Sequence, residues 1–207
     1  LYEKSNYLKK KQKKIFSQKK DVKWINNLNN IKKGPVIFFG NEFFDAIPIK
    51  QFKKINGNLQ EKNYSINKYF RIKEVFKKAN NSDKKIINSF KSLKKLNFVE
   101  LPKFGLRELK TITKKITNLN GCILIIDYGY LNSNNQNTLQ SVKKHKKNIL
   151  LKNLGKADIT SHVNFALLNE FFLKNWLKTK NIITQKEFLE NMGILKRANI
   201  ISKKNEI

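Results

Sequence analysis

The sequence predicts an α/β domain with a largely parallel β-sheet, and two observations support this prediction. Two apolar runs, GPVIFFG (34–40) and CILIIDYGY (122–130), are continuous rather than alternating, which is typical of strands covered on both faces. Amphipathic stretches with helical spacing separate and follow these runs. Buried strands that alternate with such helices characterise α/β folds, which bind ligands at the carboxyl ends of their strands.

The first third of the chain supplies the elements around the first buried strand. LYEKSNYLKKKQKKIF (1–16) predicts the end of a strand and then a helix, and DVKWI (21–25) predicts a short strand. Residues 53–80 alternate and contain Asn56-Gly57, a dipeptide that favours a two-residue hairpin turn. We therefore expect an inserted β-hairpin in this region.

Helices and polar segments follow. The stretch 106–119 has apolar residues at helical spacing and ends at Asn120-Gly121, a helix-terminating pair. A polar loop is expected after residue 130. Further helices are expected at three places: within 83–98, at about 160–178 and at 185–192.

The composition indicates one soluble, folded domain. With 207 residues and 40% hydrophobic content, the chain can bury a core of ordinary size. No apolar run reaches the roughly 18 residues that a membrane span needs, and the basic start lacks the apolar stretch of a signal peptide. Cys122 is the single cysteine, which excludes an intrachain disulfide, and its place in an apolar run predicts burial.

The formal net charge of +29 invites a nucleic-acid interpretation. Only three of the 44 basic residues are arginine, however, and bidentate recognition of bases and phosphates favours arginine. The lysines also run along the whole chain rather than in one cluster. We expect no specific nucleic acid as a partner. A lysine-rich nucleic-acid-associated protein and a non-catalytic interaction remnant stay as the alternative functions.

Several site classes have no motif in this chain. The sequence contains no GxGxxG and no GxxxxGK[ST], so it carries no phosphate-binding glycine loop. It also lacks HExxH, GxSxG and CxxC, which argues against a zinc protease, a serine hydrolase and a redox dithiol. Its two histidines are distant from each other in sequence, and we expect no metal site.

Acidic and amide side chains instead gather where the predicted strands end. Glu3 follows the strand end at the start of the chain, Asn41, Glu42 and Asp45 follow GPVIFFG, and Asp127 follows CILII. Because carboxyl ends of parallel strands meet at one edge of a sheet, these positions predict a site.

Four segments, taken in order, resemble one family. They are NEFFDAIPIKQF (41–52), ILIIDYGY (123–130), NTLQSVKKHKKNIL with GKADITSHVNF (137–165), and TQKEFLENMGILKR (184–197). Together they resemble the MidA-like S-adenosylmethionine-dependent methyltransferases, the type that includes the mitochondrial complex I assembly factor methyltransferase. The resemblance implies a Rossmann-like class I methyltransferase fold with S-adenosyl-L-methionine as cofactor. It also implies arginine N-methylation of a protein substrate, such as a complex I subunit.

The resemblance also carries expectations about boundaries and location. The first strand and the glycine-rich cofactor loop of the family would precede Leu1, so we expect an incomplete carboxyl-terminal portion that is inactive alone. Within 1–207, we assign 1–52 and 101–207 to the Rossmann-like core and 53–100 to an insertion on the substrate side. The expected location is the bacterial cytoplasm, or the mitochondrion in a eukaryote; the oligomeric state is open.

The resemblance assigns roles to Glu3 and to the polar residues that follow GPVIFFG. Glu3 and Asn41 are cofactor-binding candidates, with Glu3 on the ribose, although Glu3 also suits a helix start. Asn41, Glu42 and Asp45 are the catalytic candidates, because a helical turn would place both acids on one face for a guanidinium. Alternatively, Asn41 caps that helix and the acids complement its positive end.

Six further residues are candidates for the substrate side: Asp127, Tyr128, His145, Asp158, Thr160 and His162. Asp127 also fits an ordinary strand-end turn, in which Gly129 would adopt a positive φ. The two histidines also fit hydrogen-bonded structural roles.

Overall fold

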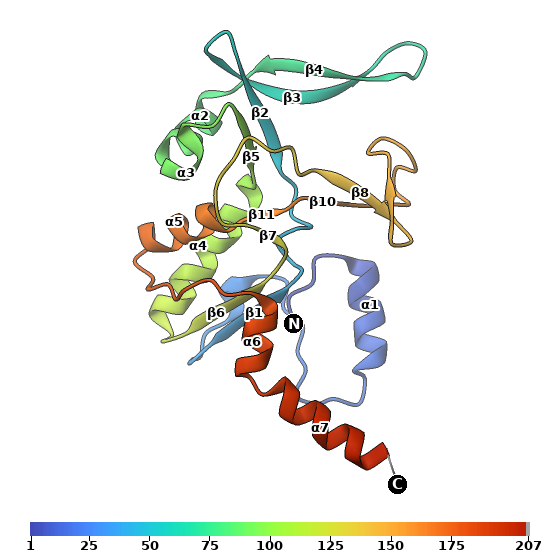
Figure 1. The fold of residues 1–207 in the computed structure, drawn as a ribbon, viewed down its shortest axis with the longest axis vertical. Helices are drawn as coiled ribbons and strands as arrows, with labels where there is room; N and C mark the ends of the chain where they lie inside the picture. Colours follow the sequence, from blue (N-terminus) through green and yellow to red (C-terminus); the bar gives the residue numbers. More distant parts are fainter. Residues whose placement is uncertain (206–207) are drawn as a thin grey trace. The chain divides into compact units, whose positions relative to one another are not determined.

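A computed structural model describes residues 1–205 of the chain (Figure 1). The chain divides into two compact units, one comprising residues 1–177 and one beginning at residue 178. The first unit contains all the strands, so the α/β class predicted from the sequence is confirmed.

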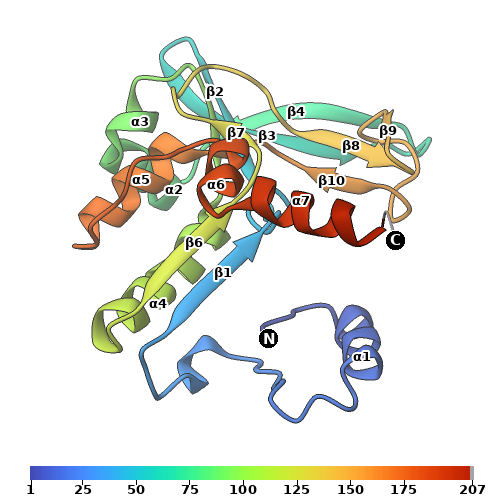
Figure 2. The ribbon, with the colours of Figure 1, turned by 60° about the horizontal axis from the view of Figure 1, so that its bottom comes forward.

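Two parallel strands form the centre of the α/β part. β1 (Ile37–Asn41) pairs with β6 (Cys122–Ile126) in the register Phe39 to Leu124, as the two apolar runs predicted. The long helix α4 (Lys103–Asn118) runs alongside this pair (Figure 2). Its apolar stripe joins the main core, against which Phe38, Ile123 and Ile125 of the two strands also pack.

The stripe on α4 is the one expected from the spacing of its apolar residues, and the helix ends as predicted. Asn120 adopts a left-handed conformation (φ 48°), and the Gly121 N–H donates to the Ile116 carbonyl at 2.9 Å, which closes a Schellman-type cap. Gly121 is required for its lack of a side chain, because a Cβ there would lie 2.4 Å from the Val36 carbonyl oxygen. The buried residues of the helix are Gly105, Leu106, Leu109, Ile112, Thr113 and Ile116.

The prediction that both strands of this pair are covered on both faces is wrong for β1. The side chains of Ile37 and Phe39 are 75% and 64% exposed, so one face of β1 is open in the described part of the chain. Cys122 is exposed as well, and the prediction that it is buried is wrong. Continuous apolar runs mark strands that a fold covers on both sides, and residues 1–205 cover β1 on one side only.

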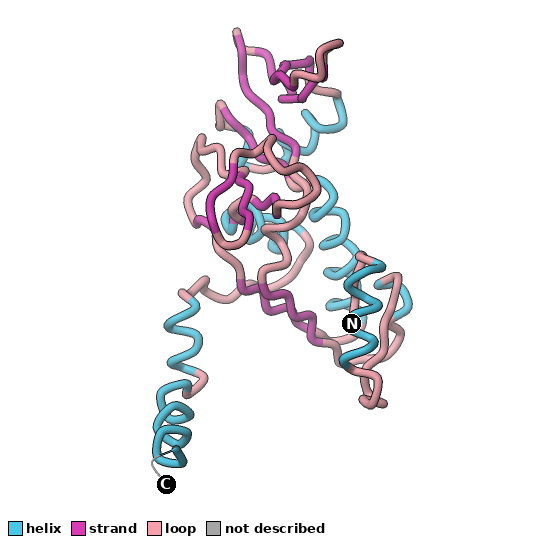
Figure 3. The backbone as a smooth tube through the Cα atoms, turned by 90° about the vertical axis from the view of Figure 1, so that its right-hand side faces the viewer, coloured by secondary structure: helices cyan, strands magenta, loops and turns pink. Residues whose placement is uncertain are grey.

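A four-stranded antiparallel sheet with the order β4-β3-β2-β5 stands apart from the parallel pair (Figure 3). The predicted hairpin is confirmed, since Asn56 and Gly57 both have positive φ (48° and 74°) and join the first two strands. A second hairpin extends it. The strands are β2 (Lys50–Ile55), β3 (Asn58–Ile66), β4 (Ile72–Lys78) and β5 (Phe98–Leu101).

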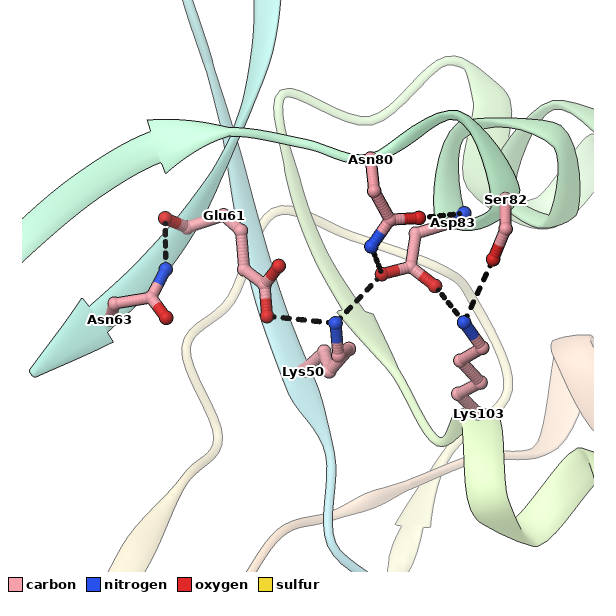
Figure 4. Close-up of polar contacts among 7 residues, drawn as sticks. All are labelled: Lys50, Glu61, Asn63, Asn80, Ser82, Asp83 and Lys103. Atoms are coloured by element: carbon pink, nitrogen blue, oxygen red, sulfur yellow. Dashed lines mark hydrogen bonds and ion pairs between the residues drawn. The ribbon is translucent and has the colours of Figure 1, made fainter.

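A buried carboxylate fixes helix α2 (Asn81–Ser89) to this sheet (Figure 4). Asp83 is fully buried and accepts from Lys103 Nζ at 2.6 Å and from Lys50 Nζ at 2.8 Å. Its backbone N–H donates to Asn80, the N-cap of α2, at 2.8 Å. One carboxylate thus joins a helix start, a strand and the first residue of α4. The short helix α3 (Lys91–Lys94) follows α2.

Residues 129–164 hold five short strands, and the sequence did not predict the four that follow residue 130. β7 and β11 form a parallel pair, and β8 lies between β10 and β9 in an antiparallel sheet. Strands of two to four residues give too little alternation for a sequence pattern to show. Their bounds are Gly129–Tyr130 (β7), Gln140–Lys143 (β8), Lys146–Asn148 (β9), Asp158–Thr160 (β10) and Val163–Asn164 (β11). Helix α5 (Phe165–Lys174) follows, as expected.

The amino-terminal segment forms the predicted helix α1 (Asn6–Ile15) and the short helix η1 (Leu28–Asn30). The two expected strand fragments reduce to one parallel bridge between Tyr2 and Ile25. Glu108 on α4 holds this segment, since it accepts from Tyr2 Oη at 3.1 Å and from Lys4 Nζ at 2.9 Å.

The second unit contains α6 (Gln185–Asn191), as predicted, and α7 (Ile194–Asn205). Thr184 is the N-cap of α6 and accepts the Glu187 N–H at 3.2 Å. None of the helices within residues 1–205 is long and apolar enough to cross a membrane.

Asp83→Asn is expected to lower the free energy of unfolding by about 3 kcal/mol at neutral pH, because it leaves two lysines without their shared buried carboxylate. Burial alone would raise the pKa of Asp83, but hydrogen bonds from Lys103 and Lys50 outweigh burial and hold it below its usual value. A lowered pKa stabilises the fold above the unfolded-state value, about 4, and the contribution disappears as the pH falls through the folded-state pKa. Urea unfolding at several pH values measures both effects.

Asp21→Asn, at an exposed position, is the matched control and should leave stability within about 0.5 kcal/mol of the wild type. Equal losses for the two variants, or an Asp83→Asn loss that persists unchanged in acid, would contradict the role given to this carboxylate.

Candidate functional site

The segment after β1 is held by a carboxylate at the end of β6. Asp127 Oδ2 accepts the backbone N–H of Phe44 at 2.9 Å and that of Asp45 at 3.3 Å, while its Oδ1 accepts the N–H of Tyr128 at 3.0 Å. Glu42 N–H donates to the Ile126 carbonyl at 2.8 Å, which continues the β1–β6 ladder by one residue. Both strand ends are thereby fixed to each other, as their positions in sequence predicted.

The expected helical turn after β1 is wrong. Residues 42–48 form turns instead, and Glu42 has a positive φ of 45°. Glu42 and Asn41 are exposed while Asp45 is buried, so the two acids do not share one face, and Asn41 does not cap a helix. The physical reason is Asp127, whose carboxylate takes the two N–H groups and sets the turn.

Asp45 is the buried acid of the site. Only 6% of the residue is exposed, and its Oδ2 accepts a short hydrogen bond from the Tyr128 hydroxyl. Its Oδ1 is buried and has no hydrogen-bond partner among the described residues. A buried carboxylate oxygen without a donor is costly, which makes this atom a candidate for a ligand contact.

The two partners of Asp45 have shifted pKa values. Burial raises the pKa of the Tyr128 phenol, and its hydrogen bond to Asp45 raises it further, so Tyr128 stays protonated and able to donate. Burial also raises the pKa of Asp127, and the nearby charge of Asp45 adds to this, although the backbone N–H groups of Phe44 and Asp45 oppose it.

The segment Asp158–Val163 brings two more candidates to this place. Ser161 N–H donates to the Asp45 carbonyl at 2.9 Å, and the His162 ring packs edge-on against Tyr128 with centroids 5.5 Å apart. Thr160 forms a side-chain hydrogen bond with Tyr128, which opposes the rise in the pKa of that phenol, and it accepts from Gln140 Nε2 at 3.3 Å. Asp45, Asp127, Tyr128, Thr160 and His162 therefore form one cluster, which we call the Asp45 cluster.

A second buried carboxylate, which was not predicted from the sequence, supports the cluster from strand β5 of the antiparallel sheet. Glu100 of β5 accepts from Thr138 N–H at 3.0 Å and from Gln51 Nε2 at 2.8 Å, and the Thr138 hydroxyl donates to it as well. Thr138 in turn accepts the His162 N–H at 3.0 Å. The available signal was an acid inside the apolar strand FVEL. Burial raises the pKa of neighbouring Tyr130 to about 12, and the charge of Glu100 contributes.

The expectation that Gly129 adopts a positive φ is wrong. A glycine is needed there because β11 approaches closely. A Cβ on Gly129 would lie 2.0 Å from the Val163 carbonyl oxygen, because β7 and β11 run directly against each other there. The Val163 N–H donates to the Tyr128 carbonyl at 3.0 Å. This pairing is what carries His162 to Tyr128.

Besides the exposed Asn41 and Glu42, three predicted site residues lie outside the Asp45 cluster. His145 is exposed at the turn between β8 and β9, where it and Lys144 have positive φ (59° and 51°). Asp158 is exposed at the start of β10. Glu3 lies beside α1, where its carboxylate accepts from Ser5 N–H at 2.8 Å and from Gln12 Nε2 at 3.2 Å.

A hollow of about 780 Å³ adjoins the cluster at His162. It is lined by the polar segments Gln136–Ser141 and Lys147–Leu150 together with His162. Within the described residues, no group of three or more His, Cys, Asp or Glu side chains could hold a metal ion.

Comparison with known proteins gives one family. Residues 1–190 match the model of the family described as "Putative S-adenosyl-L-methionine-dependent methyltransferase". Among curated proteins, the chain is similar to the protein arginine methyltransferase NDUFAF7 homolog, mitochondrial, of Caenorhabditis elegans, with 29% identity over 84% of this chain and 41% of that protein. It is 25% identical to the human mitochondrial protein arginine methyltransferase NDUFAF7, over 89% of this chain and 42% of that protein.

The chain thus spans about two fifths of the length of these relatives. Its fold resembles two solved structures from Burkholderia thailandensis. One, bound to S-adenosyl-homocysteine, has a TM-score of 0.64 and 18% identity over 84% of this chain and 47% of that one. The other has a TM-score of 0.67 and 17% identity over 84% of this chain and 49% of that one. These likenesses show the Rossmann-like methyltransferase fold.

Gly129→Ala is expected to destabilise the protein by about 3 kcal/mol, because the new Cβ forces β7 away from the Val163 carbonyl. Gly40→Ala is the matched control at the neighbouring strand end, where a Cβ would meet Phe43 at an ordinary 3.5 Å. Chemical denaturation compares the two variants. A Gly129→Ala protein as stable as Gly40→Ala would contradict the close approach.

Proposed function

The chain belongs to the S-adenosyl-L-methionine-dependent methyltransferase family whose model it matches, and we propose that the whole protein methylates an arginine side chain of another protein. The names of the curated relatives support this substrate class, since they are protein arginine methyltransferases. Bound S-adenosyl-L-methionine would supply a methyl group activated by its sulfonium, and the protein's residues would align the acceptor and manage its proton.

The observation that carries the proposal is the free acceptor atom of Asp45. Its Oδ1 is buried without a donor, while Oδ2 is engaged by Tyr128. A guanidinium is a planar donor that carboxylates bind strongly, and a donor at Oδ1 would complete the hydrogen bonds of the carboxylate. Because Oδ1 is shielded from solvent, the acceptor reaches it only when a neighbouring side chain moves.

Asp45 would then hold the acceptor guanidinium and receive the proton that it loses. The acceptor nitrogen gains a methyl group and must lose one proton, and a carboxylate in hydrogen-bond contact is suited to receive it. Tyr128, kept protonated by its raised pKa, holds the other carboxylate oxygen and fixes the plane of Asp45. Glu42 and Asn41, exposed at the end of β1, remain available to the acceptor or the cofactor.

Glu3 is the residue we assign to the ribose of the cofactor. It is partly exposed and follows the Tyr2–Ile25 parallel bridge, at the carboxyl end of its strand fragment. Each of its oxygens accepts one hydrogen bond and retains a further acceptor position, so a ribose diol can be added without breaking the contacts to Ser5 and Gln12.

The proposal also covers which protein is methylated and where in the cell this occurs. We assign the acceptor to a subunit of respiratory complex I, as the family resemblance implies. The curated relatives named above are mitochondrial. A bacterial cytoplasmic location for this chain, and the substrate-side roles of His145 and Asp158, stay predictions.

Asp45→Asn in the whole protein is expected to lower the methyl-transfer rate by a factor of about 10² to 10⁴, because an amide cannot accept the proton. Binding of S-adenosyl-homocysteine, measured by calorimetry, should change less than about twofold, since Asp45 is assigned to the acceptor side. The isosteric Tyr128→Phe variant should retain cofactor binding and lose less activity. Full methyl transfer by a folded Asp45→Asn protein would rule out the acceptor role.

A further inference from the structure

We infer that the hollow beside His162 binds the polypeptide that flanks the methylated side chain, and that it selects a flank carrying acidic residues. This inference rests on the proposed function and extends it to the choice of substrate. Three observations lead to it: what lines the hollow, the charge of its wall, and its contact with the Asp45 cluster.

The lining is suited to a peptide backbone. Four carboxamide side chains and two hydroxyls face the hollow, and a carboxamide offers the same donor and acceptor groups as a peptide bond. A few apolar side chains complete the lining. The carboxamides and hydroxyls belong to Gln136, Asn137, Thr138, Gln140, Ser141 and Asn148, and the apolar residues are Leu139, Ile149 and Leu150.

The geometry of these groups is fixed before any ligand binds. Asn148 Nδ2 donates to Ser141 Oγ at 2.9 Å, and Asn137 Oδ1 accepts from Gln51 Nε2 at 2.7 Å. Thr138 is held by Glu100 through two hydrogen bonds. A preorganised polar lining reduces the entropy that a peptide must lose on binding.

The charge of the hollow is of one sign. No Asp or Glu side chain lines it, and Lys147 does. Lys147 belongs to the β8–β9 hairpin, whose sequence KKHKK carries four lysines and His145 at positions 143–147. With a net charge of +29, the protein repels a cationic acceptor at long range, and acidic residues next to the arginine offset that repulsion.

His162 places this hollow next to the chemistry. The residue lines the hollow, and its ring also packs on Tyr128, whose hydroxyl donates to Asp45. A peptide lying in the hollow therefore has the Asp45 cluster beside it. His145, which did not join the cluster, lies at the exposed turn of the same β8–β9 hairpin as Lys147.

The test is binding of three short synthetic peptides to the whole protein, measured by calorimetry at low salt. Each has a central arginine, flanked by glutamate, glutamine or lysine. The glutamate-flanked peptide should bind about tenfold more tightly than the glutamine-flanked one, with the lysine-flanked peptide weakest. Lys147→Glu should remove most of this preference. Lys114→Glu, at an exposed position on α4, changes the net charge equally and should retain it.

Equal affinity for all three peptides would overturn the inference. An equal loss of the preference for the glutamate-flanked peptide in the Lys147→Glu and Lys114→Glu proteins would also overturn it, because this would reveal only a general charge effect. Methyl transfer to the same peptides is measured separately. Charge-selective binding without methylation would support the hollow and contradict the proposed function. Methylation that ignores both the flanks and Lys147 would support the proposed function and contradict the hollow.

Discussion

The site depends on one carboxylate. Asp127, at the end of β6, accepts the N–H groups of Phe44 and Asp45 and so determines the path of the chain after β1. Without those two hydrogen bonds, the residues after Asn41 would be free to continue as a helix, and Asp45 would not face Tyr128. A partly buried anion held by backbone N–H groups is a rigid support because its alternatives leave a charge unsatisfied.

A buried carboxylate, Glu100, performs the matching task for His162. Glu100 fixes Thr138, and Thr138 fixes His162, so the antiparallel sheet positions a residue of the Asp45 cluster. Asp83 is a further support, which joins α2 to β2 of that sheet and to the start of α4. In a chain with 44 basic and 15 acidic residues, three acids serve as supports and two of these are buried, while Asp45 keeps one oxygen without a donor among the described residues. That contrast separates the supporting acids from the acid we assign to the acceptor.

Local patterns explain what could be predicted from the sequence. The β1–β6 pair and α4 follow from apolar periodicity, and the Asn56-Gly57 hairpin follows from the φ preferences of two residues. The turn at 42–48 and the strands near 129–164 depend on contacts over long sequence separations, such as Asp127 with Phe44 and Thr138 with Glu100. Gly129 was identified for the wrong reason, since the Val163 carbonyl that requires it lies on a strand distant in sequence.

A crystal structure of the whole protein with S-adenosyl-homocysteine and a glutamate-flanked arginine peptide tests the central claim most directly. We predict a guanidinium nitrogen within hydrogen-bond distance of Asp45 Oδ1, while Asp127 still accepts from Phe44 and Asp45 and Tyr128 still contacts the carboxylate. A bound arginine that contacts other residues, with Asp45 Oδ1 still shielded and without a donor, would contradict the account.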